Sequence, residues 1–262
     1  MQTIEHIMCL LLACEGDTKF FDEHLASFLL PDAIRMYSKN REYSHFEKSP
    51  DGKDCSYMKY PTDMKTLSLE SVQEALAKDS HLVEHAPCVI GEETDIAMFD
   101  STNKHLPLQM KLGIFCHLAQ DIEFDTFIRD VFDCERRYED IFTSPTGEDI
   151  DGTTCRKLIA DIETQLSYVL AKQVYDELGI VCNQAWFEKN VYPTLLRDYP
   201  TELADNTYKY MRFNLAIDEA ISKQDWSLVE APVAGIPYDD YQTISERAVF
   251  VTHYLKEISN GR

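Results

Sequence analysis

The sequence has few of the residues that interrupt regular secondary structure. Only nine glycines and ten prolines occur in 262 residues. A β-sandwich or β-barrel of this length would need a turn signal about every ten residues, so their scarcity favours helices. Hydrophobic residues make up 44% of the chain, which is enough for a packed interior. No stretch has the composition of a flexible linker, and we expect one helical domain over residues 1–262.

Basic residues are also scarce. The chain has 25 Lys and Arg residues against 46 Asp and Glu residues, which gives a formal net charge of -21. Such a surface repels nucleic acid unless metal ions or a local basic groove offset the field. Nucleic acid is therefore not expected as a partner without metal. Alternatively, the acidic surface could imitate the charge of nucleic acid and bind a protein that normally binds DNA or RNA.

Long apolar runs and paired cysteines are missing too. The apolar run that ends at Cys14 has eight residues, and no Lys or Arg precedes it, so it fits neither a membrane span nor a secretory signal. The eight cysteines form no Cys-x-x-Cys motif and resemble buried free thiols. These features predict a cytoplasmic protein without a transmembrane segment. The oligomeric state is left open.

Apolar side chains recur at helical spacing along most of the chain. Residues 3–15 and 20–29 predict a helical hairpin, with Pro31 ending the second helix and a possible restart over 33–46. A long central helix is predicted from Leu108 to about Phe142. Further helices are predicted over residues 68–78, 154–179, 183–197, 201–222 and 240–258, whereas 86–107 has an irregular pattern. The expected fold is a compact all-α bundle of about seven or eight helices, in which 143–262 could form an appended layer.

The central helix carries the strongest candidate for chemistry. His117 and Asp121 are four residues apart, so both side chains lie on one face and can bind one metal ion. A hydrogen-bonded structural pair is the alternative. An unpaired carboxylate is costly to bury in so apolar a helix, and a cation would remove that cost. Asp32 and His45 could complete an Asp/His/His/Asp set suited to zinc or another borderline divalent ion.

Two segments of the first half resemble signature segments of the bacterial zinc-dependent phospholipase C family. They are Phe28-Leu29-Leu30-Pro31-Asp32 followed by His45, and the segment from Leu112-Gly113 to His117-Leu118-Ala119-Gln120-Asp121. That family is all-helical and shares its fold with zinc-dependent single-strand nucleases. It hydrolyses phosphodiesters with a metal cluster.

The resemblance implies roles for five residues. Asp32, His45, His117 and Asp121 would hold one zinc ion, Asp121 could bridge to a second, and His6 would serve another metal of the cluster. Asp32 would also orient or deprotonate the attacking water, and the cation would lower the pKa of that water and neutralise charge in the transition state.

The chain also departs from the family. The family supplies a further histidine and then a His-x-x-x-Glu pair soon after the central motif, but no histidine occurs here between Asp121 and His253. His253 and Glu257 have the right spacing far down the chain. Asp125 could substitute as a ligand, although a solvated or capping acid is its expected role.

Two functions from different classes follow from these residues. The first is a zinc-dependent phosphoesterase that acts on a phosphodiester or a phospholipid head group. The second is a non-catalytic acidic interaction protein that keeps the fold and binds a protein partner. No Gly-x-Gly-x-x-Gly, Walker A, Gly-x-Ser-x-Gly or His-Glu-x-x-His motif occurs, so nucleotide-cofactor and serine-hydrolase chemistry lack their usual signals.

Overall fold

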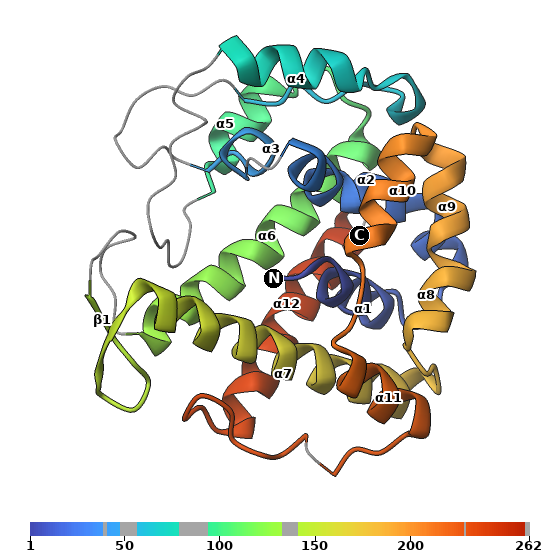
Figure 1. Ribbon diagram of the computed structural model, residues 1–262. Coiled ribbons are helices and arrows are strands. Elements are labelled where there is room, and N and C mark those ends of the chain that lie inside the picture. Colours follow the sequence, from blue (N-terminus) through green and yellow to red (C-terminus); the bar gives the residue numbers. More distant parts are fainter. Residues whose placement is uncertain (39–40, 48–56, 79–93, 133–140, 228, 260–262) are drawn as a thin grey trace.

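The structure is a computed structural model that describes all residues except 39–40, 48–56, 79–93, 133–140, 228 and 260–262. It confirms the all-α fold: helices make up most of the described chain, with one small β-hairpin (Figure 1). The first half contains α1 (Thr3–Cys14), α2 (Thr18–Ser38), α3 (Arg41–His45), the 3-10 turn η1 (Met64–Thr66), α4 (Leu69–Lys78), α5 (Ile96–Thr102) and α6 (Leu108–Val131). The second half contains β1 (Ile141–Thr143), β2 (Asp149–Asp151), α7 (Gly152–Leu178), α8 (Gln184–Asn190), α9 (Tyr192–Asp198), α10 (Thr201–Tyr210), α11 (Leu215–Lys223) and α12 (Tyr238–Ser259).

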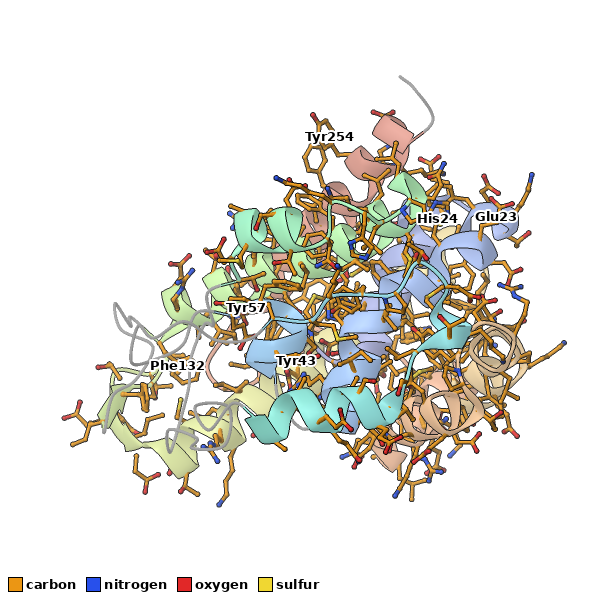
Figure 2. The ribbon with its side chains drawn as sticks, turned by 90° about the horizontal axis from the view of Figure 1, so that it is seen from above. Glu23, His24, Tyr43, Tyr57, Phe132 and Tyr254 are labelled. Carbon is orange, nitrogen blue, oxygen red and sulfur yellow. The ribbon has the colours of Figure 1, made fainter. Side chains whose placement is uncertain are left out.

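Helix α6 runs through the middle of the bundle and packs on both α2 and α12 (Figure 1). Helix α1 lies beside it and contacts α2, α7 and α12, so every residue of α1 is buried. The surface is formed by other parts of the chain: Tyr254 stands at the outer end of α12, where 56% of it is exposed (Figure 2). The first helix of the chain is therefore a core helix surrounded by later ones.

Helix α2 does not end before Pro31, and that prediction was wrong. The helix continues to Ser38 with Pro31 in its interior. A proline inside a helix removes one backbone hydrogen bond and strains the preceding turn, at a cost of about 3 kcal/mol. Packing of α2 against α1, α6 and α10 offsets that cost, because residues 24–34 of the helix are all buried. Asp32 consequently lies inside a buried helix and not at a helix start.

The predicted extension of the central helix to Phe142 was also wrong. Helix α6 ends at Val131, and Ile141–Thr143 instead forms strand β1, paired with β2 in the register Phe142 to Ile150. The turn between the strands contains Gly147 at φ +83°, a left-handed conformation that suits glycine. Residues 133–140 lie outside the described part of the chain.

Several other segments divide into more and shorter helices than predicted. The predicted helix 183–197 breaks at Val191 into α8 and α9, and 201–222 breaks into α10 and α11. The irregular stretch 86–107 contains α5, whose first turn is capped by Asp95 accepting a hydrogen bond from the Met98 amide. The predicted helix over 68–78 is α4, and the amide of Ser71 donates to Ser68 Oγ at its start. Among the described residues, no helix is both long and apolar enough to cross a membrane.

One close contact fixes how α2 and α6 cross. A Cβ atom at Gly113 would collide with Ser27 Oγ and lie 3.2 Å from the backbone nitrogen of Phe28. Glycine is therefore required where the two helices meet, since any side chain would push them apart. Asp32 on α2 and His117 on α6 each lie about one turn after this contact. The packing of Gly113 on Ser27 and Phe28 therefore helps to set the distance between these two side chains.

Candidate metal centre

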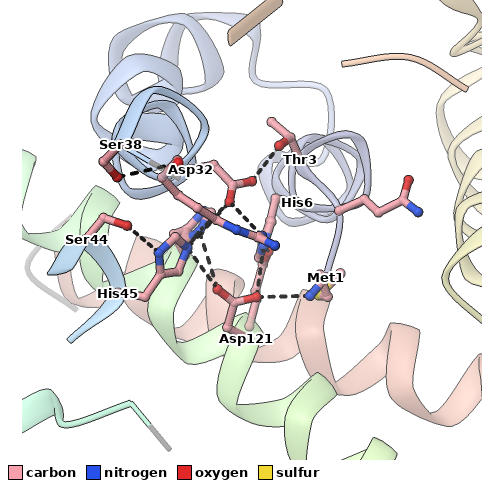
Figure 3. A network of polar contacts seen from close by, with 12 residues as sticks. Met1, Thr3, His6, Asp32, Ser38, Ser44, His45 and Asp121 are labelled. Carbon is pink, nitrogen blue, oxygen red and sulfur yellow. Dashed lines mark hydrogen bonds and ion pairs between the residues drawn. The ribbon is translucent and has the colours of Figure 1, made fainter. Parts of the chain in front are cut away.

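The five predicted ligands come together in the interior of the bundle (Figure 3). They are His6 on α1, Asp32 on α2, His45 at the end of α3, and His117 and Asp121 on α6. Each is at most 1% exposed. Four helices thus deliver three imidazoles and two carboxylates to one buried point, and these groups could hold a metal ion.

Several pairs of side-chain atoms in this cluster lie at the separations expected between two ligands of one small cation. His45 Nε2 lies 3.2 Å from His117 Nε2, 3.4 Å from Asp32 Oδ1 and 3.5 Å from Asp121 Oδ2. His117 Nε2 lies 3.5 Å from Asp121 Oδ2 and 3.9 Å from Asp32 Oδ1. Tetrahedral ligands at zinc bond lengths stand about 3.3 Å from one another. Two groups of three residues could each hold a metal ion, and they share His117: one is His6, Asp32 and His117, and the other is His45, His117 and Asp121. We call Asp32, His45, His117 and Asp121 the cage.

Hydrogen bonds account for these separations less well than a cation does. Protein N–H···O bonds are about 2.7–3.2 Å long, but the four nitrogen–oxygen distances within the cage are 3.4 to 3.9 Å. Asp32 Oδ1 has no hydrogen-bond partner within the described structure. A buried carboxylate oxygen without a donor is costly.

The surrounding side chains orient two of the cage ligands. The hydroxyl of Thr3 donates to Asp32 Oδ2 at 2.5 Å, which leaves Oδ1 facing the two histidines. Ser44 Oγ lies 2.8 Å from His45 Nδ1, so Nε2 of that ring is directed into the cage. Contacts of this kind fix the rotamer and tautomer of metal ligands.

The charge states of the cage also suit a cation. Burial acts to raise the pKa of Asp32, but the close contact with His45 and the other nearby imidazoles hold that pKa well below its usual value. Burial and the neighbouring His6 hold the pKa of His117 well below its usual value, against the opposing effect of the two carboxylates. A charged Asp32 and a neutral His117 are the forms that bind metal.

Asp121 presents its two oxygens to different groups. Oδ2 faces the cage, whereas Oδ1 lies 3.2 Å from His6 Nε2 and 3.1 Å from the α-amino nitrogen of Met1. The His6 ring stacks on His117 with their centroids 3.9 Å apart. The Asp121 carboxylate therefore lies between the cage and a second polar position next to His6 (Figure 3).

Other candidate residues lie away from the cage. His253 and Glu257 form a partly exposed pair, with Nε2 and Oε1 3.7 Å apart. His24 stacks on Phe20, and His105 Nε2 lies 2.8 Å from the carbonyl oxygen of Tyr60. His81 and His85 lie outside the described residues. The expectation that Asp125 is solvated was wrong, because only 7% of its surface is exposed.

The cysteines that the structure describes are buried and free, as the sequence predicted. These are Cys9, Cys14, Cys116, Cys155 and Cys182. Burial raises the pKa of the Cys14 thiol to about 12, and the charge of Asp17 acts in the same direction, against Lys256. Such thiols are protonated at neutral pH and have little nucleophilic character.

Sequence reasoning did not identify Arg35 as part of the site. Its Nη1 atom lies 3.7 Å from Asp32 Oδ1, and 40% of its side chain is exposed. The spacing of three residues from Asp32 on one helix was the available signal. A cavity of about 400 Å³ opens beside this arginine and is also lined by Met1, Thr3, Met36, Glu163 and Tyr210. Arg35 thus connects the buried cage with the surface.

A larger cavity of about 540 Å³ lies between the α1–α2 turn and α8. Its lining includes Leu11, Phe21 and Trp186, and none of the five predicted ligands lines either this cavity or the one beside Arg35. We therefore assign the site by its side-chain chemistry and not by cavity size.

The chain matches no protein-family model, no curated protein and no solved structure. The assignment of a metal centre therefore rests on the side chains described above: buried nitrogen and oxygen ligands at cage distances, with one arginine at the entrance.

Proposed function

We propose that this protein is a zinc-dependent phosphoesterase that hydrolyses a phosphodiester or a phospholipid head group. The proposal agrees with the resemblance of residues 28–45 and 112–121 to the zinc-dependent phospholipase C family. The observation that carries it is the buried cluster of imidazoles and carboxylates, in which His45, His117 and Asp121 form one group that could hold a metal ion and His6, Asp32 and His117 form another. Imidazole nitrogens combined with carboxylate oxygens suit zinc better than calcium or magnesium, which take more oxygen ligands.

Arg35 gives the proposal its substrate class. The overall charge of -21 works against an anionic substrate, so binding one requires local positive charge. Arg35 supplies it, because its guanidinium lines a cavity, lies 3.7 Å from Asp32 Oδ1 and can donate to two non-bridging phosphoryl oxygens at once.

The reaction follows from these positions. The cage residues would hold the zinc ion, which would supply Lewis acidity: it would lower the pKa of an adjacent water and neutralise charge on the phosphoryl oxygens. Asp32 orients or deprotonates the attacking water, and Arg35 stabilises the charge that grows on the phosphoryl group. The water oxygen bonds to phosphorus and the ester P–O bond breaks. One water proton passes to the leaving alcohol, and the other stays with the phosphate monoester or is released.

Metal analysis of the purified protein is the first test. We expect at least one zinc ion per chain by mass spectrometry, and a large loss of zinc in the variants Asp32→Ala and His117→Ala. His253→Ala is the matched control, because this histidine also pairs with a carboxylate four residues away but lies at the surface. If the zinc content per chain is the same in the unmodified protein and in both cage variants, the enzyme proposal is wrong.

Hydrolysis of bis-p-nitrophenyl phosphate is the second test. The zinc-loaded protein should release p-nitrophenol, and Asp32→Ala should not. A folded, zinc-loaded protein without activity on any phosphodiester would instead indicate a structural metal.

The non-catalytic interaction protein remains the second candidate because of one observation. No histidine occurs between Asp121 and His253, and the His253–Glu257 pair lies at the surface, away from the cage. The family's additional metal ligands thus have no counterpart among the histidines of this chain. This candidate predicts an inert protein that is captured by a protein partner through its acidic surface.

A further inference from the structure

A groove on the surface lies where the C-terminal end of α1 meets α7 and α12. It holds a cavity of about 330 Å³, and its lining includes side chains from all three segments. The five predicted metal ligands are not part of that lining. We call this cavity, together with the outer face of α12 beside it, the α12 groove.

Large apolar side chains are exposed in the α12 groove. Phe250 lines the cavity and is 67% exposed, and Tyr254, one turn further along α12, is 56% exposed (Figure 2). Leu12 and Val249 also line the cavity. Because Tyr254 lies beyond the cavity lining, the apolar surface is longer than the cavity itself. Exposed apolar surface that continues along a helix is typical of a site where another chain packs.

The opposite face of α12 holds the helix on the bundle. Ser245, Ala248 and Thr252 are at most 1% exposed. Thr252 Oγ1 accepts a hydrogen bond from the side-chain amide of Gln120 on α6. The packing of α12 therefore uses its inner face, and the outer face with Phe250 can contact another molecule.

The charge that borders this apolar surface is negative. Glu15, Glu177 and Glu246 line the cavity, and all three are exposed. They come from the end of α1, from α7 and from α12, so carboxylates surround the apolar side chains on three sides. Among the described residues, no Lys or Arg lines the cavity.

Nearby basic groups do not balance these carboxylates. Lys256 Nζ donates to the carbonyl oxygen of Cys14 at 3.1 Å, so its charge lies at the C-terminal end of α1. His253 Nε2 lies 3.7 Å from Glu257 Oε1. Arg247 is exposed but does not line the cavity. The groove therefore favours a positively charged occupant.

We propose that the α12 groove binds a basic amphipathic helix of a partner protein, whose apolar side chains cover Phe250 and Tyr254 and whose Lys or Arg residues lie beside the glutamates. A helix fits because its apolar side chains recur every three or four residues and can follow two turns of α12. A small organic cation could fill the cavity but would leave Tyr254 exposed. A second copy of this chain is disfavoured, because two chains of net charge -21 repel each other.

Titration calorimetry with a synthetic amphipathic peptide of leucine and lysine is the direct test. We expect the unmodified protein to bind it, and Phe250→Ser to bind at least about 10-fold more weakly, because aromatic side chains at the centre of an interface carry much of the binding energy. Leu215→Ser is the matched control, since this leucine is 82% exposed on α11, outside the groove, and its loss should not change the affinity.

A pair of charge-reversal variants tests the glutamates. Glu177→Lys combined with Glu246→Lys should also weaken binding at least about 10-fold, because both carboxylates line the cavity. Glu70→Lys combined with Glu74→Lys makes the same change in net charge on α4 and should have little effect. A peptide with glutamate in place of lysine should not bind. Circular dichroism confirms that each variant is folded.

Several results would overturn the proposal. Absence of binding by the basic peptide would do so, and so would equal affinity in the groove variants and their controls, which would mean that the peptide binds the acidic surface as a whole. If tetraethylammonium binds as tightly as the peptide, the occupant is a small cation. If light scattering shows a dimer that Phe250→Ser converts to a monomer, the occupant is a second copy of this chain.

The inference goes beyond the proposed function and does not depend on it. The groove variants should keep the zinc content of the unmodified protein, since none of them changes a predicted ligand. A protein that binds the peptide in the α12 groove but holds no zinc would remove the phosphoesterase proposal and leave this one standing.

Discussion

Two histidine–carboxylate pairs of identical helical spacing occur in this molecule, His117–Asp121 on α6 and His253–Glu257 on α12. Their closest nitrogen–oxygen distances are similar, 3.5 Å and 3.7 Å. Their surroundings differ: the first pair is at most 1% exposed, whereas the side chains of the second are 35% and 50% exposed. Spacing on a helix therefore sets the distance within a pair, but it does not make a site.

What separates the pairs is the contribution of other helices. Asp32 from α2 and His45 from α3 close the cage around His117 and Asp121, and the buried carboxylates have no water to solvate them. The His253 pair has solvent on one side, so water can satisfy both groups. A metal centre in a helical bundle thus depends on where helices converge.

The largest expected effect comes from replacing Asp121, because one of its carboxylate oxygens faces the cage histidines and the other faces His6. Asp121→Ala should weaken zinc binding by more than about 100-fold, since it removes a direct ligand and not only an orienting residue. The matched substitution Glu257→Ala should leave zinc content unchanged. Mass spectrometry of both variants checks the comparison, and equal zinc loss in the two would contradict it.

Arg35→Ala should be the next largest effect. We expect phosphodiester hydrolysis to fall about 100-fold, because one charged donor to the transition state is lost. The zinc content should be unchanged, since Arg35 Nη1 is 3.7 Å from the carboxylate and outside the cage. Arg197→Ala, which breaks an ion pair with Asp22 on the surface, is the control and should retain activity.

Gly113→Ala should change how α2 and α6 pack against each other, while all five predicted ligands are kept. The new Cβ collides with Ser27 Oγ, and overpacking of this kind costs about 1–3 kcal/mol. Urea denaturation measures the loss in the free energy of unfolding, and zinc affinity should fall with it. Adding Ser27→Ala removes the colliding hydroxyl and should restore part of the free energy of unfolding and part of the zinc affinity. If neither is restored, the contact between Gly113 and Ser27 does not determine how α2 and α6 cross.

The smallest effect is expected at the surface pair. His253→Ala should change the free energy of unfolding by less than about 0.5 kcal/mol, as exposed ion pairs contribute little. Thermal or urea denaturation of this variant checks the value. A loss of several kcal/mol would show that α12 depends on this pair, and the contrast with His117 would then disappear.

The residues of the cage could be found from the sequence because their chemistry is local. His117 and Asp121 are recognisable from helical spacing, and Asp32 and His45 from the resemblance of their segments to a zinc-binding family. The all-α fold likewise follows from helical periodicity and few chain breakers. These signals lie within short stretches of sequence.

The remainder could not be predicted because it depends on tertiary contacts. Pro31 stays inside α2 only because three other helices pack around that segment, and no local rule shows this. Thr252 is 132 residues from Gln120, so nothing in the sequence connects the two. Arg35 was within reach of a spacing argument from Asp32, but its position at a cavity was not.

The hydrogen bond between Gln120 and Thr252 has a consequence for the order of assembly. The four cage ligands all lie between residues 32 and 121, so the cage can form once the first six helices have folded. His6 contacts Gln120, which donates in turn to Thr252 on α12, the last helix of the described chain. During synthesis, the helices that carry the cage side chains are therefore complete before the C-terminal helix exists, whereas the hydrogen bond from Gln120 to α12 forms only when that helix docks.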